Sequence, residues 1–180
     1  MDVIPVGRHD VTMTWKAPEV IRGDGSLIAG EREMLLGYLN FQRSTLLTKC
    51  TGLTGEELAR RAAPPSSMSL LGLIRHMAKV ERTWFRLRFA GEALQPLFVG
   101  KDVDFDDVDP ASARHEYEQL VEEQRLADAA VRNASLDDVF THADETYSLR
   151  FLYLHMIGEY ARHNGHADMV RERIDGSTGF

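Results

Sequence analysis

The sequence has a single cysteine, Cys50, among its 180 residues. One thiol cannot form a disulfide within the chain or build a thiolate metal cluster, so the composition favours a protein of the reducing cytoplasm. No pattern places a partner base beside Cys50. We therefore expect it to be a small, half-buried helical residue and not a catalytic nucleophile.

Long apolar runs and an excess of positive charge are also missing. No segment is apolar enough to span a membrane, and the start MDVIPVGRHDVTMTWKAPEV lacks the basic and apolar parts of a signal peptide. The net charge is −7, and acidic and basic residues are interleaved along the chain. Without a basic patch to follow a phosphate backbone, we expect neither a nucleic acid nor a membrane as a partner.

Several common catalytic signatures are absent as well. No glycine-rich phosphate loop follows a strand, and neither the G-x-S-x-G motif of serine hydrolases nor the H-E-x-x-H motif of zinc peptidases occurs. Hydrophobic residues make up 43% of the chain and charged residues 27%, which is ordinary for one soluble domain that buries a real core.

Helical periodicity runs through most of the sequence, and strand signals are almost absent. Pro110 suits a first helical turn, and Gly91 and Gly176 follow expected helix ends. We predict an all-α fold, a four-helix bundle with a long crossover. The long helices are expected at about residues 31–50, 69–90, 111–133 and 148–174, with the crossover at 91–110.

Two segments outside the long helices carry predictions of their own. Residues 1–25 contain two prolines and the turn-like GDG, and they are expected to form an irregular arm that packs on the 26–180 domain through Trp15. The crossover contains the acidic run KDVDFDDVD and is expected to be solvated. Thr54 is expected to cap a short helix that begins with GEEL.

The last long helix departs from the usual pattern of an amphipathic helix. Its stretch EYARHNGH, residues 159–166, turns Glu159, His163 and His166 toward the side where apolar residues should lie. Glu159 and His163 are one turn apart, so a carboxylate oxygen and an imidazole nitrogen can converge on one ion. His155 flanks the same side one turn earlier. The inward stripe is Leu152, Met156, Glu159, His163, His166 and Val170.

His76 is the candidate for a third ligand from a facing helix, because it lies beside the apolar stripe of the 69–90 helix. A buried carboxylate that faces a buried imidazole is costly to desolvate, and a divalent cation between them would compensate. Two alternatives stay open at this point: a Glu–His hydrogen bond needs no metal, and a histidine at an apolar edge is commonly a satisfied core residue. The remaining histidines, expected at the surface, are His9, His115 and His142.

Three stretches together resemble the DinB/YfiT-like superfamily, in its actinobacterial branch of unknown function: FQRSTLL, SLLGLIRHMAKVERTWF and EYARHNGHADMVRERIDG. The resemblance covers about residues 28–176. It implies a four-helix bundle, often dimeric, with a divalent metal between three side chains. The common triad is one histidine from the second long helix and an H-x-x-x-H pair from the last.

This sequence has Glu159 in place of the first histidine of that pair. A set of His, Glu and His resembles the metal site of the mycothiol-dependent maleylpyruvate isomerase, and by that likeness the ligands are His76, Glu159 and His163. The likeness also implies Zn²⁺ as the favoured ion, with Ni²⁺ or Fe²⁺ as alternatives, and mycothiol, a low-molecular-weight thiol, as co-substrate. The isomerase has a further C-terminal domain for which a chain ending at Phe180 leaves no room, so maleylpyruvate is not the expected substrate.

The expected activity is that of a metal-dependent enzyme that acts with a thiol on a small electrophile, as an S-transferase or a thiol-dependent isomerase. Three protein ligands leave an open position where an ion can lower the pKa of a thiol or water. His166 and His155 are the candidates for moving a proton, or they support the site by hydrogen bonding or line its pocket. The alternatives are a non-catalytic metal- or ligand-binding stress-response bundle and a metal-dependent hydrolase. A homodimer is expected from the resemblance.

Overall fold

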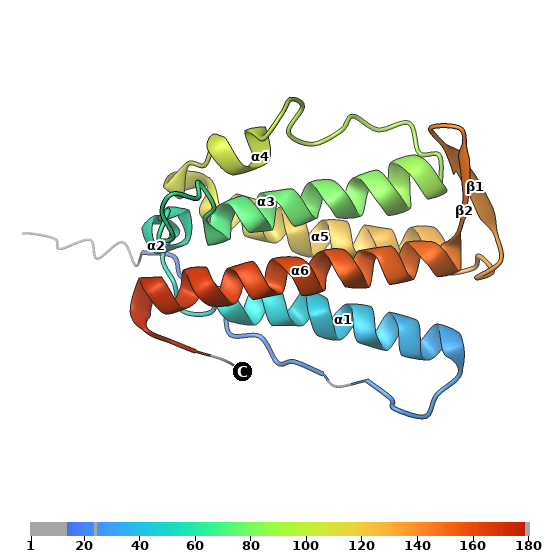
Figure 1. The fold of residues 1–180 in the computed structure, drawn as a ribbon, viewed down its shortest axis with the longest axis horizontal. Coiled ribbons are helices and arrows are strands. Elements are labelled where there is room, and N and C mark those ends of the chain that lie inside the picture. Colours follow the sequence, from blue (N-terminus) through green and yellow to red (C-terminus); the bar gives the residue numbers. More distant parts are fainter. Residues whose placement is uncertain (1–13, 24, 179–180) are drawn as a thin grey trace, which may run out of the picture.

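The computed structural model describes residues 14–23 and 25–178, and four long helices lie side by side in this part of the chain (Figure 1). They are α1 (Glu31–Cys50), α3 (Leu70–Glu81) with its continuation η1 (Arg82–Phe89), α5 (Ala113–Val131) and α6 (Leu149–Asp175). α1 packs against α6 and α3 against α5, and α3 also contacts α6. The expectation of a mostly helical protein is confirmed.

Short elements connect the long helices: α2 (Gly55–Ala59), α4 (Val103–Asp106) and the 3₁₀ turn η2 (Pro110–Ser112). In the described part of the N-terminal arm, the Trp15 ring packs edge-on against Tyr117 of α5, with centroids 6.0 Å apart. The Ala17 N–H donates to the Leu53 carbonyl at 2.9 Å, which ties the arm to the α1–α2 turn. None of the helices in the described residues is long and apolar enough to cross a membrane.

Local capping signals in the sequence account for several helix ends. The Thr54 hydroxyl accepts from the Glu57 N–H, and the Glu57 carboxylate accepts from the Thr54 N–H, so the predicted cap of the short helix is a full capping box. Ser69 and Ser148 each accept from the backbone N–H three residues further on, at the starts of α3 and α6. Gly176, with φ of 80°, ends α6 in the left-handed conformation that glycine favours.

A two-stranded antiparallel hairpin, β1 (Val139–His142) and β2 (Glu145–Ser148), precedes α6 and corrects the expectation of a purely helical chain. Its two-residue turn, Ala143 and Asp144, has positive φ at both positions. Such turns are usually marked by glycine or asparagine, and the residues Ala143 and Asp144 lack that signal, so this turn could not be predicted from its residues. Phe140 of β1 is buried against the ring of Phe89, which seats the hairpin at the end of η1 (Figure 1).

The second long helix, predicted as one helix over 69–90, changes its winding after Glu81. Residues 82–89 are π-helical, and the Ala90 N–H donates to the Phe85 carbonyl five residues back. A π-helical turn holds more residues than an α-helical turn, so side chains beyond Glu81 point away from the direction that the α-helical spacing predicts. Trp84, placed by that spacing on the core stripe, is only half-buried and lies against His155 of α6.

The crossover between η1 and α5 folds back onto α3 at α4. Gly72 permits this close approach, because a Cβ there would lie 3.2 Å from the Phe105 ring and 3.3 Å from the Phe105 Cα. The expectation that the whole acidic run is solvated is wrong for Asp104, which is only 2% exposed. The burial of its carboxylate is tolerated because His76 and Lys79 hydrogen-bond to the two carboxylate oxygens, and the Arg75 guanidinium donates to the Asp104 backbone carbonyl.

A buried polar network joins three of the long helices. Glu81 of α3 is fully buried, and it accepts hydrogen bonds from the Arg43 guanidinium of α1 at 2.7 and 2.8 Å. The Tyr160 hydroxyl of α6 donates to the same carboxylate at 2.8 Å. Because Tyr160 adjoins Glu159 in the chain, this network fixes α6 against α3 directly beside the polar stripe of α6.

Candidate metal centre

His76 of α3 and the pair Glu159 and His163 of α6 come together between the two helices. Each offers one ligand atom, and these atoms all lie within 4.8 Å of one another. The ring centroids of His76 and His163 are 4.7 Å apart, and His163 Nε2 is 3.7 Å from Glu159 Oε2. The one-turn spacing on α6 and the packing of α3 on α6 thus produce the predicted juxtaposition.

Asp104 orients His76. Its Oδ2 lies 2.7 Å from His76 Nδ1, and Lys79 Nζ lies 3.2 Å from its Oδ1. Burial acts to raise the pKa of Asp104, but the hydrogen bonds from His76 and Lys79 outweigh it, so the pKa lies below its usual range. An ionised carboxylate only accepts, so Nδ1 carries the proton and Nε2 is the nitrogen left for an ion.

A ring contact holds the His76 imidazole from the side of α4. Phe105 stacks on it with centroids 4.8 Å apart and an interplanar angle of 28°. Neither Asp104 nor Phe105 was singled out from the sequence. The signal that could have found them is the apolar spacing of Val103, Phe105 and Val108 inside the acidic run, which marks a segment that packs on the body.

His163 is buried, with 8% of its surface exposed. Burial, and then the neighbouring His76, lower its pKa to about 4, although Glu159 acts in the opposite direction. The imidazole is therefore neutral at pH 7, which is the form that binds a metal ion. Its Nδ1 lies 3.4 Å from His166 Nδ1, so Nε2 is the nitrogen that faces Glu159.

The donor set fits a divalent ion. Two atoms that bind one zinc ion at about 2.0–2.2 Å each are at most about 4.4 Å apart, so the three side chains reach a common ion with little or no rotation. Two neutral imidazole nitrogens and one carboxylate oxygen are ligands that zinc accepts, and three protein ligands leave a further position open. Glu159 Oε1 is also 3.2 Å from the exposed guanidinium of Arg162, which leaves Oε2 on the side of His163.

The other candidate residues have different places. Of the three metal-ligand candidates, His163 is the one that His166 contacts, and the Nδ1 atoms of the two rings lie 3.4 Å apart. His155 lies one turn before Glu159 and contacts aromatic rings, with its centroid 4.3 Å from that of Trp84. His115 and His142 are exposed, as expected, although His142 is the last residue of β1 and does not lie in a loop. His9 lies outside the described residues.

Cys50 does not take part in this site. It is fully buried, not half-buried as expected, and burial raises its thiol pKa to about 12. Its thiol therefore stays protonated at neutral pH, where it packs in the core and donates to the Leu46 carbonyl at 3.4 Å.

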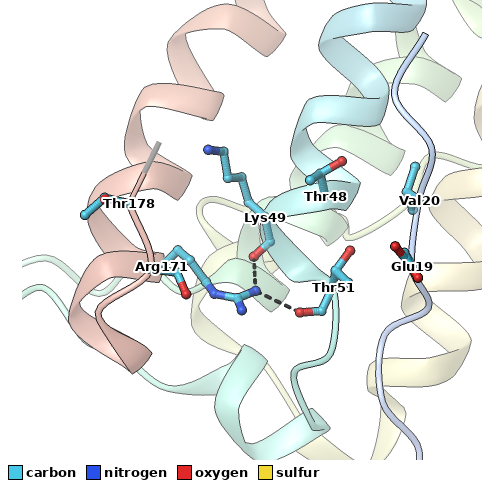
Figure 2. A pocket seen from close by; sticks show the side chains of 8 residues that line it. Glu19, Val20, Thr48, Lys49, Thr51, Arg171 and Thr178 are labelled. Carbon is cyan, nitrogen blue, oxygen red and sulfur yellow. Dashed lines mark hydrogen bonds between the residues drawn. The ribbon is translucent and has the colours of Figure 1, made fainter. Parts of the chain in front are cut away.

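A cavity of about 320 Å³ lies elsewhere, between the C-terminal end of α1, the arm and the residues after α6 (Figure 2). Arg171 is one of its lining residues, and its guanidinium donates to the carbonyls of Lys49 and Thr51 at 2.9 Å (Figure 2). This arginine therefore caps the C-terminus of α1. The cavity is lined by none of the three metal-ligand candidates.

Fold and site together define a mostly helical protein in which His76, Glu159 and His163 lie close enough together that they could hold one metal ion. Residues 34–176 match the family model of the mycothiol S-transferases, and the chain belongs to this DinB-like family. The matched range spans the positions of His76, Glu159 and His163, and the name of the family refers to mycothiol, the thiol that the sequence resemblance implied. Comparisons with curated proteins and with solved structures gave no match.

Proposed function

We propose that the protein is a divalent-metal-dependent S-transferase that joins mycothiol to a small electrophile. Membership of the mycothiol S-transferase family supports the thiol, and the convergence of His76, Glu159 and His163 supports the metal. The convergence is the single observation that carries the proposal, because it gives the site an open position next to protein ligands. Zn²⁺ is the favoured ion, with Ni²⁺ or Fe²⁺ as alternatives.

When bound, a divalent ion lowers the pKa of a thiol at its open position, which supplies a thiolate at neutral pH. The residues of the chain prepare this chemistry. Asp104 accepts from His76 Nδ1–H, which leaves Nε2 as the nitrogen that would bind an ion, and burial keeps His163 neutral. Glu159 adds one negative charge, which offsets part of the charge of the ion.

The thiol proton needs an acceptor, and His155 is the better placed of the two predicted candidates. Burial lowers the pKa of His155, so its ring is neutral at pH 7. No hydrogen bond from His155 is found among the described residues, whereas His166 Nδ1 lies against His163. A free imidazole nitrogen one turn from Glu159 can take the proton directly or through water.

The proposal also includes the type of bundle, the domain boundaries, the oligomeric state and the cellular location. We retain a four-helix bundle of the DinB/YfiT-like type for residues 26–180, with residues 1–25 as its arm, and a homodimer in the reducing cytoplasm. Light scattering at micromolar concentration tests the dimer, and a monomeric mass contradicts it.

The decisive experiment measures metal content, melting temperature and mycothiol consumption for the parent and for His163→Ala. We expect one bound ion per chain, thiol consumption with a panel of electrophiles, and loss of both in the variant. A chelator should lower the melting temperature of the parent and change that of His163→Ala little, because bound metal stabilises the native state by mass action.

His142→Ala, which removes an exposed histidine, is the matched control and should behave as the parent does. Cleavage of esters or amides without thiol consumption would favour the metal-dependent hydrolase. Metal binding without either activity would favour the non-catalytic binding protein. A parent that binds no metal and ignores the chelator would leave Glu159 and His163 as a hydrogen-bonded pair only.

A further inference from the structure

Beyond the metal-ligand candidates, aromatic side chains form a surface along the contact between α6 and the helix formed by α3 and η1. Trp84 lies against His155 at 4.3 Å between centroids, and His155 stacks on Phe151 at 5.9 Å with an interplanar angle of 21°. Tyr147 of the hairpin lies 5.3 Å from Phe151. These rings are not sealed in the core: Trp84, Tyr147 and His155 are half-buried, and Phe151 is 42% exposed.

This surface adjoins the proposed reaction centre. His155 is four residues before Glu159 on α6, which is one helical turn, or about 6 Å along the axis. On the other helix, Trp84 follows His76 by eight residues. A molecule that lies on the Trp84 and His155 rings therefore has its far end close to the open position beside Glu159 and His163.

Arg88 adds a positive charge to the surface. Its guanidinium carbon lies 4.2 Å from the centroid of the Trp84 ring. The nearby arginines of η1 are paired: Arg82 and Arg86 both donate to Glu123. Arg88, which is half-buried, has no carboxylate partner among the described residues. Burial lowers its pKa, as expected for a cation that has lost water without gaining a counter-charge.

The N–H donors of Arg88 remain available to a ligand. Contact with a ring face uses the charge of a guanidinium but not its five N–H donors, which bind a carboxylate in a fork geometry. A half-buried cation of this kind next to flat rings is complementary to a molecule that has both an anionic group and a flat conjugated part.

We propose that Arg88, Trp84 and His155 form the binding site of the electrophile, and that this electrophile is a flat conjugated carboxylate. The inference rests on the S-transferase function proposed above and names its substrate class. In the reaction, the thiolate sulfur bonds to the β-carbon of a conjugated carbonyl, and the electron pair of the C=C bond passes to the α-carbon. That carbon takes up one proton, which balances the proton lost by the thiol.

The test compares 3-benzoylacrylic acid, a conjugated aromatic acid, with its methyl ester, using mycothiol and the metal-loaded protein. Arg88→Met should lower kcat/KM for the acid about 10- to 100-fold and leave the ester within about twofold. Trp84→Leu should lower kcat/KM for both. Arg114→Met, which removes an exposed arginine paired with Glu118 on α5, is the control of equal charge change and should alter neither.

Three results would overturn the assignment. Equal losses for acid and ester in Arg88→Met would give Arg88 a structural role. A higher KM for mycothiol with both electrophiles would assign the surface to the thiol. An equal kcat/KM for the acid with the parent and with Arg88→Met would show that Arg88 does not bind the carboxylate of the substrate.

A binding measurement separates failure of this inference from failure of the S-transferase function. Calorimetry with 3-benzoylpropionic acid, the saturated and unreactive analogue, needs no catalysis. The parent should bind it, Arg88→Met should bind it about tenfold or more weakly, and Arg88→Lys should lie between them. If the parent consumes no thiol but shows this order, the function is wrong and the binding site stands. Equal affinity of the parent and Arg88→Met for 3-benzoylpropionic acid would show that the proposed binding site is wrong.

Discussion

At the scale of single residues, Asp104 controls how His76 meets an ion. Because its carboxylate holds Nδ1–H at 2.7 Å, Asp104→Ala should free the ring to rotate and to change tautomer. We expect metal affinity to fall about 10- to 100-fold, as is typical when such a partner is removed, with activity restored by excess zinc. Competition with a chromophoric chelator measures the change.

Asp106→Ala is the matched control, because Asp106 ends the same short helix but is exposed, with Arg61 3.6 Å away. It should bind zinc as the parent does. If Asp104→Ala binds zinc with the parent affinity, Asp104 does not orient His76.

His163 makes the stability of the metal-free protein depend on pH. The folded pKa is about 4 and the ordinary value is 6.5, so between these values the unfolded chain binds more protons than the folded one. The stabilisation is therefore complete above about pH 6.5 and is lost progressively as the pH falls toward 4. Urea unfolding of the metal-free protein at several pH values should show this loss, and His163→Gln should show a shallower one. Identical slopes would mean that His163 titrates normally.

The sequence predicted three residues of the candidate site and missed their support. Glu159 and His163 could be paired from helical spacing alone, because both lie on one helix. His76 required the resemblance to fix its role, since spacing could not say which residue of another helix it faces. Asp104 lay in an acidic run whose composition indicated solvent exposure. Only the return of α4 onto α3, a long-range contact, buries it.

At the scale of elements, predictions succeeded where the cause was local. The first helix was predicted at residues 31–50, as observed, and the Thr54 cap and the Gly176 stop follow from neighbouring residues. The π-helical turn after Glu81 and the hairpin at residues 139–148 were not predicted. Both depend on packing, since the hairpin turn lacks glycine and π-helical winding has no simple sequence period.

The contact between α4 and α3 gives a prediction at this scale. Gly72→Val should push Phe105 away, because even a Cβ would lie 3.2–3.3 Å from Phe105 atoms. The displacement should carry Asp104 from His76 and weaken zinc binding as well as stability. Gly158→Ala on α6 is the control: nothing lies within 4 Å of its Cβ, so the better helix propensity of alanine should stabilise the protein by about 1 kcal/mol. Calorimetric melting and zinc titration measure both effects, and parent-like zinc binding by Gly72→Val would contradict the link.

At the scale of the whole molecule, the candidate site and the packing of the helices share the same two elements. His76 and Glu81 lie on α3, and Glu159 and Tyr160 are neighbours on α6. The proposed site needs an open position for chemistry, whereas the side chains of Glu81, Arg43 and Tyr160 beside it are buried and hydrogen-bonded to one another. We infer that the Glu81 network holds the contact between α3 and α6 rigid. The ligand atoms therefore stay close together in the absence of an ion.

This division of roles predicts that stability and metal binding can be separated. Glu81→Ala would leave Arg43 buried without the carboxylate that its Nε and Nη2 contact, although Asn40 and Asp128 still accept from Nη1. Removing one partner of a buried ion pair typically costs about 3–5 kcal/mol, and the remaining bonds of Arg43 favour the lower end. We expect a large loss of unfolding free energy in urea, with zinc still bound at saturating concentration because the three ligands remain.

Glu118→Ala, which removes the partner of Arg114 in an exposed pair, should change stability little and serves as the control. A parent-like unfolding free energy for Glu81→Ala would show that the network does not hold the helices together. Loss of zinc at temperatures where the variant is fully folded would show instead that Glu81 sets the geometry of the metal ligands. Glu81 contacts none of the three ligands, so this effect could act only through the positions of α3 and α6.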